Sequence, residues 1–320
     1  MRVLVTGSSG QIGTNLALRL LGDGHEVVGI DRRENTWTDS ITTHVLDLSV
    51  VHEVTAARIG SAAAGEVDAV VHLAAHAKVH ALVERPLGAL ENHVMVTNAL
   101  EFARQARVPI LLASSREVYG NAVTRGVPVS ETAADYRSAA SPYAAMKLAS
   151  EALAAAYARC YGVAYAVLRF SNVYGRYDND LARLERAIWI FARNIREGRP
   201  VPIFGADKTL DFTYVDDAVD GAYRCLARLV ARDSGVVGET FNVAYGKGTR
   251  LLDVAGIIGR GLESEPTLEI EDARPGEVTW YVADISKARA RLGYEPTVSI
   301  SDGIPRALEW AGLAAALATG

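Results

Sequence analysis

A tyrosine and a lysine in this chain are spaced to act together in proton transfer. Segment 141–147 begins with Ser141, a good helix N-cap, and Pro142, which suits the first helical position. Tyr143 and Lys147 are then predicted at positions i and i+4 of a helix, on one face of its first turns. A free phenol has a pKa of about 10, and a neighbouring ammonium group favours the phenolate. We therefore expect Lys147 to lower the pKa of Tyr143, which would act as a general base.

Ser115 is predicted to complete this chemical group. It follows the apolar segment Ile110–Ser114, a predicted strand, and its hydroxyl would hold the substrate oxygen. Glu117 lies two residues further on, close enough to bring a carboxylate to the reacting ring. Arg116 is expected to contact substrate, and it could pair with an acidic substrate group or with Glu117 itself. The expected catalytic residues are Ser115, Tyr143, Lys147 and Glu117.

A glycine-rich turn predicts a dinucleotide site. Thr6–Gly13 reads TGSSGQIG and lies between a predicted strand and a predicted helix. Glycines at such a place permit a tight turn and let a pyrophosphate reach the backbone N–H groups at the helix N-terminus. Asp31 ends the next predicted strand, where a carboxylate accepts hydrogen bonds from the adenosine ribose. The expected contacts in the turn are Gly7, Ser9, Gly10, Gln11, Ile12 and Gly13.

The residues around Asp31 favour NAD over NADP. The carboxylate of Asp31 would repel a 2′-phosphate, although Arg32 and Arg33 follow at once and could offset that repulsion by pairing with it. Further contacts are expected at the carboxyl ends of strands, where an open α/β sheet binds its ligands, and on the helix that follows. Those expected contacts are Arg32, Asp47, Leu48, Leu73, Ala74, Ala75 and Asn92, with Tyr143 and Lys147 beside the nicotinamide. An oxidised nicotinamide there is expected to act with Lys147 in lowering the pKa of Tyr143.

The elements that must position these residues form an alternating series. Apolar strand-length segments without strict polar alternation are typical of parallel strands covered on both faces. Their alternation with helices predicts an α/β fold, a Rossmann-type doubly wound parallel sheet. The predicted strands are Val3–Thr6, Glu26–Asp31, Ala69–Leu73, Ile110–Ser114, Tyr165–Phe170 and Glu239–Ala244. The predicted helices are Gln11–Gly22, Ala89–Ala106, Leu181–Arg196, Asp216–Ala231, Leu251–Leu262 and Ser301–Ala318.

Composition argues against several classes of protein. The net charge of −5 and the lack of a basic block make nucleic-acid binding unexpected. The apolar runs are too short for a membrane span, and the first residues lack the pattern of a signal peptide. Cys160 and Cys225 are expected to be small buried hydrophobes in a reducing compartment, with neither a disulfide nor a metal site. We therefore expect a cytoplasmic protein without a membrane partner.

Taken together, these motifs resemble the extended short-chain dehydrogenase/reductase family, specifically its NAD-dependent sugar-nucleotide epimerases and dehydratases. The likeness continues through RFSNVYG at 169–175, DFTYVDD at 211–217 and RPGE at 274–277. It implies that Asn172 and Arg274 bind the nucleotide diphosphate of a nucleotide-sugar substrate, and that the protein is a homodimer paired through two helices per subunit. It also implies an NAD-binding domain of residues 1–172 and 212–245, with a smaller substrate-binding α/β domain of residues 173–211 and 246–320.

The sequence departs from the family pattern in three places. Leu210 stands where relatives usually carry an arginine that grips a substrate phosphate, so one contact is lost unless Lys208 or another cation replaces it. The segment 76–80 is unusually basic, and its Lys78 is expected either to touch substrate or to remain solvated. Arg116 and Glu117 combine features of different branches, because an acid at position 117 is typical of dehydratases and decarboxylases.

We favour a nucleotide-sugar 4-epimerase that works through a transient 4-keto sugar. A dehydratase or decarboxylase that shares the oxidation at C4 is the main alternative, and a carboxylate at position 117 could start such an elimination by removing the C5 proton. A reductase or dehydrogenase with net cofactor turnover, and a non-catalytic NAD(P)-binding protein, are further alternatives. The last of these has little need of Ser115, Tyr143 and Lys147 together.

Overall fold

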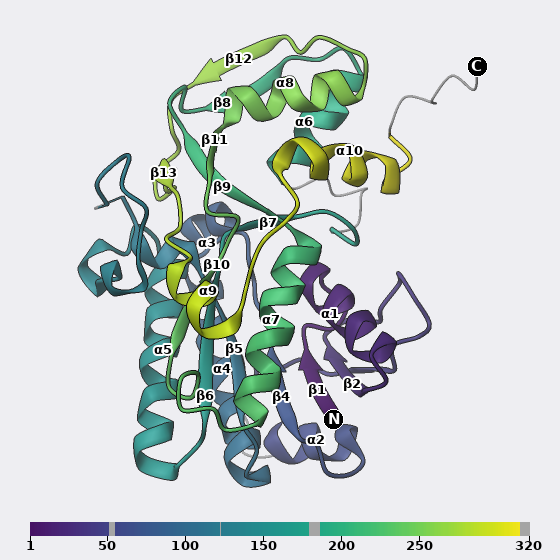
Figure 1. Ribbon diagram of the computed structural model, residues 1–320, viewed down its shortest axis with the longest axis vertical. Coiled ribbons are helices and arrows are strands. Elements are labelled where there is room, and N and C mark those ends of the chain that lie inside the picture. Colours follow the sequence, from purple (N-terminus) through teal and green to yellow (C-terminus); the bar gives the residue numbers. More distant parts are fainter. Residues whose placement is uncertain (51–54, 122, 179–185, 314–320) are drawn as a thin grey trace.

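The computed structural model describes residues 1–50, 55–121, 123–178 and 186–313 (Figure 1). Within these ranges, the largest sheet has seven parallel strands in the order β10-β6-β5-β4-β1-β2-β3. The predicted doubly wound parallel sheet is confirmed, and its order reverses between β1 and β4. The strands are β1 Arg2–Thr6, β2 Glu26–Asp31, β3 Thr43–Val45, β4 Ala69–His72, β5 Ile110–Ser115, β6 Tyr165–Phe170 and β10 Thr240–Val243.

Helices cover both faces of this sheet. Successive side chains of β1 point to opposite faces, so Val3 and Val5 join one apolar core while Leu4 joins another. Helices α1 and α7 cover the first face, and α2, α4 and α5 cover the second (Figure 1). This double coverage explains why the strands are apolar throughout. The helices are α1 Gln11–Gly22, α2 Thr55–Ala63, α4 Leu87–Ala106, α5 Pro142–Tyr161 and α7 Val215–Val230.

A second group of elements lies beyond the carboxyl ends of the large sheet (Figure 1). Here β9 pairs with β7, β11 and β13, and β8 pairs with β12. Its strands are β7 Asn172–Tyr174, β8 Val201–Phe204, β9 Thr209–Tyr214, β11 Gly248–Arg250, β12 Leu268–Glu271 and β13 Trp280–Tyr281; its helices are α6 Ala187–Arg196, α8 Leu251–Gly261 and α10 Ile300–Trp310. Two short helices, α3 Val79–Glu84 and α9 Ser286–Leu292, lie closer to the large sheet, with α9 against α7 and β10.

Two predicted helices differ from the structure by more than two residues in length. Residues 181–185 of the expected helix Leu181–Arg196 lie outside the described residues, and α6 begins only at Ala187 because Arg186 has an extended backbone. The expected helix Ser301–Ala318 ends at Trp310, close to Gly312, which has a left-handed φ of 65°. Residues 314–318 of that prediction lie outside the described residues.

Candidate active site

The glycine turn joins β1 to α1 at the point where the strand order reverses. Gly7 has a φ of 75°, and a Cβ there would lie 2.6 Å from the backbone nitrogen of Ala74. A Cβ on Gly13 would lie 2.0 Å from the carbonyl oxygen of Gly7. The N-cap residue of α1 is Gly10, which has no side chain to cap the helix. The backbone N–H groups of Gln11, Ile12 and Gly13, in the first turn, therefore receive no hydrogen bond from an N-cap side chain. The turn therefore has the close backbone packing and the open helix N-terminus that suit a pyrophosphate.

Asp31 lies beside this turn at the end of β2. Its carboxylate accepts hydrogen bonds from the backbone nitrogens of Ser9, at 3.1 Å, and Arg33, at 3.2 Å. The guanidinium of Arg33 donates to the carbonyl of Ser9, whereas Arg32 is exposed. Hydrogen bonds from Ser49, with a smaller effect of Arg32, hold the pKa of Asp47 below its usual value. Asp31, Arg32 and Asp47 thus lie on one side of the glycine turn.

The other expected cofactor contacts differ in their burial and in the hydrogen bonds that they already make. Leu73, Ala74 and Ala75 follow β4 and are half-buried, with Leu73 and Ala74 donating backbone hydrogen bonds to Thr6. Leu48 packs its side chain into the core and accepts a hydrogen bond from Asn98 through its carbonyl. The side-chain amide of Asn92 is buried and bonds to both the backbone nitrogen and the carbonyl of His76. Asn92 therefore holds the loop after β4 in place.

The structure brings Ser115, Tyr143 and Lys147 together. Ser115 ends β5, and its hydroxyl bonds to the phenol of Tyr143. As expected, the Ser141 hydroxyl caps α5 by accepting from the backbone nitrogen of Ala144, and Tyr143 and Lys147 lie in the first turns. The Lys147 ammonium donates to the carbonyl of Ala113 at 2.8 Å and lies 5.7 Å from the centroid of the Tyr143 ring.

Burial controls the protonation of this group. It raises the pKa of Tyr143 to about 12, and the hydrogen bond from Ser115 only partly opposes that effect. Burial also lowers the pKa of Lys147 to about 8, with Glu151 acting in the opposite direction. The protein's own groups therefore do not bring the phenol below its ordinary pKa, and the expected lowering rests on Lys147 together with an oxidised nicotinamide. Desolvation of the ring outweighs the nearby charges.

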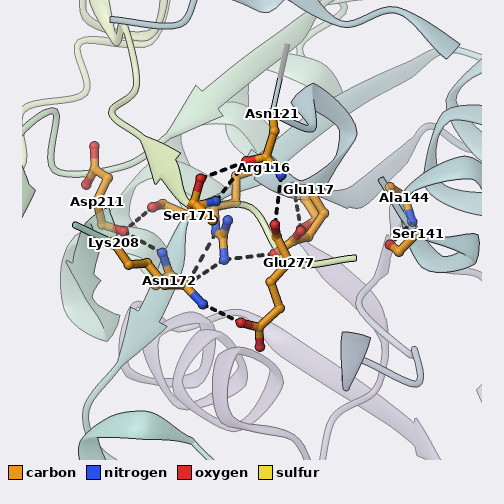
Figure 2. A network of polar contacts seen from close by, with 12 residues as sticks. Arg116, Glu117, Asn121, Ser141, Ala144, Ser171, Asn172, Lys208, Asp211 and Glu277 are labelled. Atoms are coloured by element: carbon orange, nitrogen blue, oxygen red, sulfur yellow. Dashed lines mark hydrogen bonds and ion pairs between the residues drawn. The ribbon is translucent and has the colours of Figure 1, made fainter. Parts of the chain in front are cut away.

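Arg116 and Glu117 adjoin this group in the short 3₁₀ helix Arg116–Tyr119 (Figure 2). The backbone nitrogen of Glu117 donates to the Ser115 hydroxyl at 3.2 Å. The guanidinium of Arg116 pairs with the Glu117 carboxylate at 2.8 Å and donates to the side-chain oxygen of Asn172. Of the two roles considered for Arg116, the structure places it in the pair with Glu117.

The expected phosphate-binding cations occupy different environments. The guanidinium of Arg274 lies 3.6 Å from the ring centroid of Phe204 and, within the described ranges, makes no hydrogen bond or ion pair. Lys208 is buried and paired with Glu277 at 2.6 Å (Figure 2). Leu210 is buried in β9, in register with Thr249 of β11 and Tyr281 of β13. Lys78 is exposed just before α3.

One residue near the site was not predicted from the sequence. The guanidinium of Arg186 donates to the side-chain oxygen of Gln11 at 2.8 Å and to the carbonyl of Val173, and it pairs with Asp178 at 3.1 Å. Its charge also lowers the pKa of Tyr143. No motif marks this arginine, and its contact with the glycine turn at Gln11 spans 175 positions of the chain.

The described residues contain neither a membrane-spanning helix nor a cluster of metal-binding side chains. None of the helices in them combines the length and apolar character that a membrane crossing requires. No group of three or more histidine, cysteine or acidic side chains in the same residues is arranged to hold a metal ion.

Known proteins resemble this chain over nearly its whole length. The model of the NAD dependent epimerase/dehydratase family matches residues 3–244. The UDP-glucose 4-epimerase of Mycolicibacterium smegmatis is 32% identical over 323 aligned residues, which cover 97% of this chain and 98% of that one. The UDP-glucose 4-epimerase of Thermotoga maritima, solved with UDP-glucose, has a TM-score of 0.86 at 28% identity and covers 98% of this chain and 99% of its own. The UDP-glucuronic acid 4-epimerase of Bacillus cereus, solved with UDP-glucuronic acid and NAD, has a TM-score of 0.85 at 26% identity with the same coverage.

Proposed function

The chain belongs to the NAD-dependent epimerase/dehydratase family, and from that membership we propose that it is an NAD-dependent nucleotide-sugar 4-epimerase. The observation that carries this proposal is the contact of Ser115 with Tyr143, with Lys147 beside them at the carboxyl end of β5. A catalyst of this kind oxidises the sugar at C4 and then reduces the 4-keto sugar from the opposite face.

The residues of the glycine turn fit the dinucleotide. Gly7 and Gly13 leave no room for a Cβ, and the N-terminus of α1 is open to a pyrophosphate. Asp31 would hold the adenosine ribose, and its negative charge supports NAD over NADP. When bound, NAD supplies a reversible hydride acceptor. The residues proposed to hold it are Gly7, Ser9, Gly10, Gln11, Ile12, Gly13, Asp31, Arg32, Asp47, Leu48, Leu73, Ala74, Ala75 and Asn92.

Three side chains would manage the proton on the sugar oxygen. Tyr143 exchanges that proton through its phenol oxygen, while the Ser115 hydroxyl holds the same sugar oxygen in place. Lys147 contributes a positive charge 5.7 Å from the centroid of the phenol ring. Because burial raises the pKa of Tyr143 to about 12, deprotonation of the phenol requires more positive charge than these side chains supply alone.

The ion pair of Arg116 with Glu117 supports epimerisation over elimination. Elimination needs a carboxylate near C5 that is free to take a proton, and Glu117 would have to give up its pairing with Arg116 to do so. A dehydratase or decarboxylase is the second candidate, and the presence of a carboxylate two residues after Ser115 favours it.

Substrate phosphates would be bound by Asn172 and Arg274. Arg274 supports this role because its guanidinium makes no ion pair within the described part of the chain. Lys208 stands close in sequence to Leu210, but its pairing with Glu277 would have to open before it could replace the missing arginine. We retain Lys78 as a candidate contact because of its exposed position before α3.

We also propose that the protein is a cytoplasmic homodimer. Helices α4 and α5 pack side by side, and α4 exposes the apolar side chains of Leu87 and Leu90. Cys225 is buried as expected, whereas the expectation for Cys160 is wrong, because it lies exposed near the end of α5. Both thiols are free, which supports a reducing compartment. Light scattering on the purified protein tests the dimer, and a Leu90→Glu variant should shift it to monomers.

Product analysis tests the proposed activity. UDP-, GDP- and dTDP-sugars incubated with the protein in deuterated water, without added NAD and then with it, should give C4 epimers by NMR and mass spectrometry. The products should carry no deuterium at C5. Deuterium at C5 that disappears in Glu117→Gln would establish the elimination chemistry instead.

A further inference from the structure

Arg116 and Glu117 form a buried ion pair that leaves two atoms without partners. The two residues are only 8% and 6% exposed. One guanidinium nitrogen, Nη1 of Arg116, and one carboxylate oxygen, Oε2 of Glu117, are buried and make no hydrogen bond to any described residue. A buried polar atom without a partner costs free energy, so such atoms are rare unless a ligand completes them.

A second buried pair shows that this chain can satisfy such groups fully. Arg169 and Glu151 pair at 2.6 Å, and Arg169 also donates to the Tyr119 hydroxyl and to the carbonyl of Glu131. Glu151 additionally accepts from the Ser114 hydroxyl. None of the side-chain nitrogens or oxygens of this second pair is left without a partner. Other buried polar atoms lack a partner, among them Oδ1 of Asp178, but of these two buried arginine–glutamate pairs only the one beside Ser115 has unpartnered atoms.

The ion pair of Arg116 with Glu117 lies next to residues that are proposed to bind the substrate. Glu117 donates its backbone N–H to the Ser115 hydroxyl, which in turn bonds to Tyr143. On its other side, Arg116 contacts Asn172, whose amide nitrogen donates to the carbonyl of Asp211 (Figure 2). The pair thus lies between the group that would hold the C4 oxygen and a residue expected at the diphosphate.

The unpartnered atoms are one donor and one acceptor in a pair whose charges cancel. A hydroxyl group both accepts and donates, so its two roles match the donor Nη1 of Arg116 and the acceptor Oε2 of Glu117. A carboxylate can only accept, so it would leave Oε2 unpaired and place a second negative charge beside Glu117.

We propose that Arg116 and Glu117 select the hydroxymethyl group at C6 of the sugar, so that the substrate is a neutral hexose and not a uronate. This inference rests on the proposed 4-epimerase function. C6 is chosen because it is the position at which the sugars named for the solved relatives, UDP-glucose and UDP-glucuronic acid, differ in charge. Arg116 alone would favour the acid, and Glu117 reverses that preference.

The test compares three nucleotide sugars on the wild-type protein. We expect kcat/KM for UDP-glucose to exceed that for UDP-glucuronic acid by about tenfold or more, because the carboxylate at C6 of the uronate would be repelled by the carboxylate of Glu117. UDP-6-deoxyglucose should be about a hundredfold poorer than UDP-glucose, because a site built to hydrogen-bond a hydroxyl rejects the analogue that lacks it. A preference for the uronate, or equal use of the 6-deoxy sugar, would overturn the proposal.

Glu117→Gln tests the charge directly. The amide keeps an acceptor and removes the negative charge, so the preference for UDP-glucose over UDP-glucuronic acid should shrink by about tenfold or more. Glu151→Gln is the matched control, since it neutralises the carboxylate of the saturated pair and should leave the ratio unchanged. An unchanged ratio in a folded Glu117→Gln protein would also overturn the proposal. If that variant does not fold, the comparison of the three nucleotide sugars on the wild-type protein decides whether the proposal holds.

Binding separates this proposal from the proposed function. If the wild-type protein epimerises no nucleotide sugar, the 4-epimerase function fails. The affinities of UDP-glucose, UDP-6-deoxyglucose and UDP-glucuronic acid, measured by calorimetry, then decide the selection of the C6 group. The same order of preference in affinity supports it, and equal affinities overturn it.

Discussion

Replacing Lys147 with methionine should reveal how strongly its buried ammonium destabilises the folded protein. Lys147 is only 4% exposed, and burial lowers its pKa from 10.5 to about 8. The folded protein therefore holds this proton more weakly than the unfolded chain does. The difference between the two pKa values, roughly 2.5, lowers the free energy of unfolding by about 3 kcal/mol at pH values where the lysine is charged in both states.

The sign of the pH dependence follows from this difference. Below about pH 8 both states carry the proton and the full destabilisation is present. Between about pH 8 and 10.5 the unfolded chain binds more protons, so the free energy of unfolding rises with pH. Lys147→Met has no such titration. The stability of the wild type minus that of the variant should therefore rise by about 3 kcal/mol from about pH 7.5 to 10.5.

Urea unfolding of both proteins in the same buffers, at steps of pH, measures this difference. Taking the difference cancels the titrations that both proteins share. Lys247→Met, at an exposed lysine, controls for the loss of one positive charge. A difference that stays constant with pH would refute the account of Lys147 as a lysine whose charged form is destabilised by burial.

Three further predictions concern the site. Tyr143→Phe should lower kcat by about a hundredfold or more while UDP-glucose still binds, by stopped-flow assay and calorimetry, and a wild-type rate would remove Tyr143 from the mechanism. The wild type should bind NAD more tightly than NADP in a fluorescence titration, and Asp31→Asn should narrow that preference; tighter NADP binding in the wild type would mean that Arg32 dominates over Asp31. Gly13→Ala should weaken NAD binding by about tenfold or more, because its Cβ would lie 2.0 Å from the carbonyl oxygen of Gly7, and unchanged affinity would show that the turn can shift without cost.

The sequence was sufficient for most of the large sheet and its helices, because most of these elements carry their own signal. Strand β3, of three residues, and helix α2 were not among the predicted elements. Helix α1 has the bounds expected from Gln11–Gly22, and strand β6 those expected from Tyr165–Phe170. Both are apolar segments between clear boundaries. The glycine turn and the spacing of Tyr143 and Lys147 are equally local, so they too can be recognised without a structure.

The smaller sheets could not be predicted in the same way. Strand β12 alternates Leu268 and Ile270 with glutamates but has only four residues, all exposed, and β13 has only two. Neither is a long or buried apolar segment that would predict a strand. Such strands are defined by partners far along the chain. The pairing of Lys208 with Glu277, which are 69 positions apart, could not be predicted from the sequence for the same reason. The pKa of Tyr143 also depends on burial by neighbours that the sequence does not place.

The strand order of the large sheet has a consequence for synthesis on the ribosome. Strand β6 pairs with β5 on one side and with β10 on the other, yet roughly 70 residues separate the end of β6 from the end of β10. At usual translation rates these take about 4–14 s to make. During that interval β6 is an apolar edge strand in the nascent chain, and such edges can pair with other chains. Expression should therefore depend on chaperones that bind nascent chains, and pauses in translation between codons 171 and 240 should lower the yield of soluble protein.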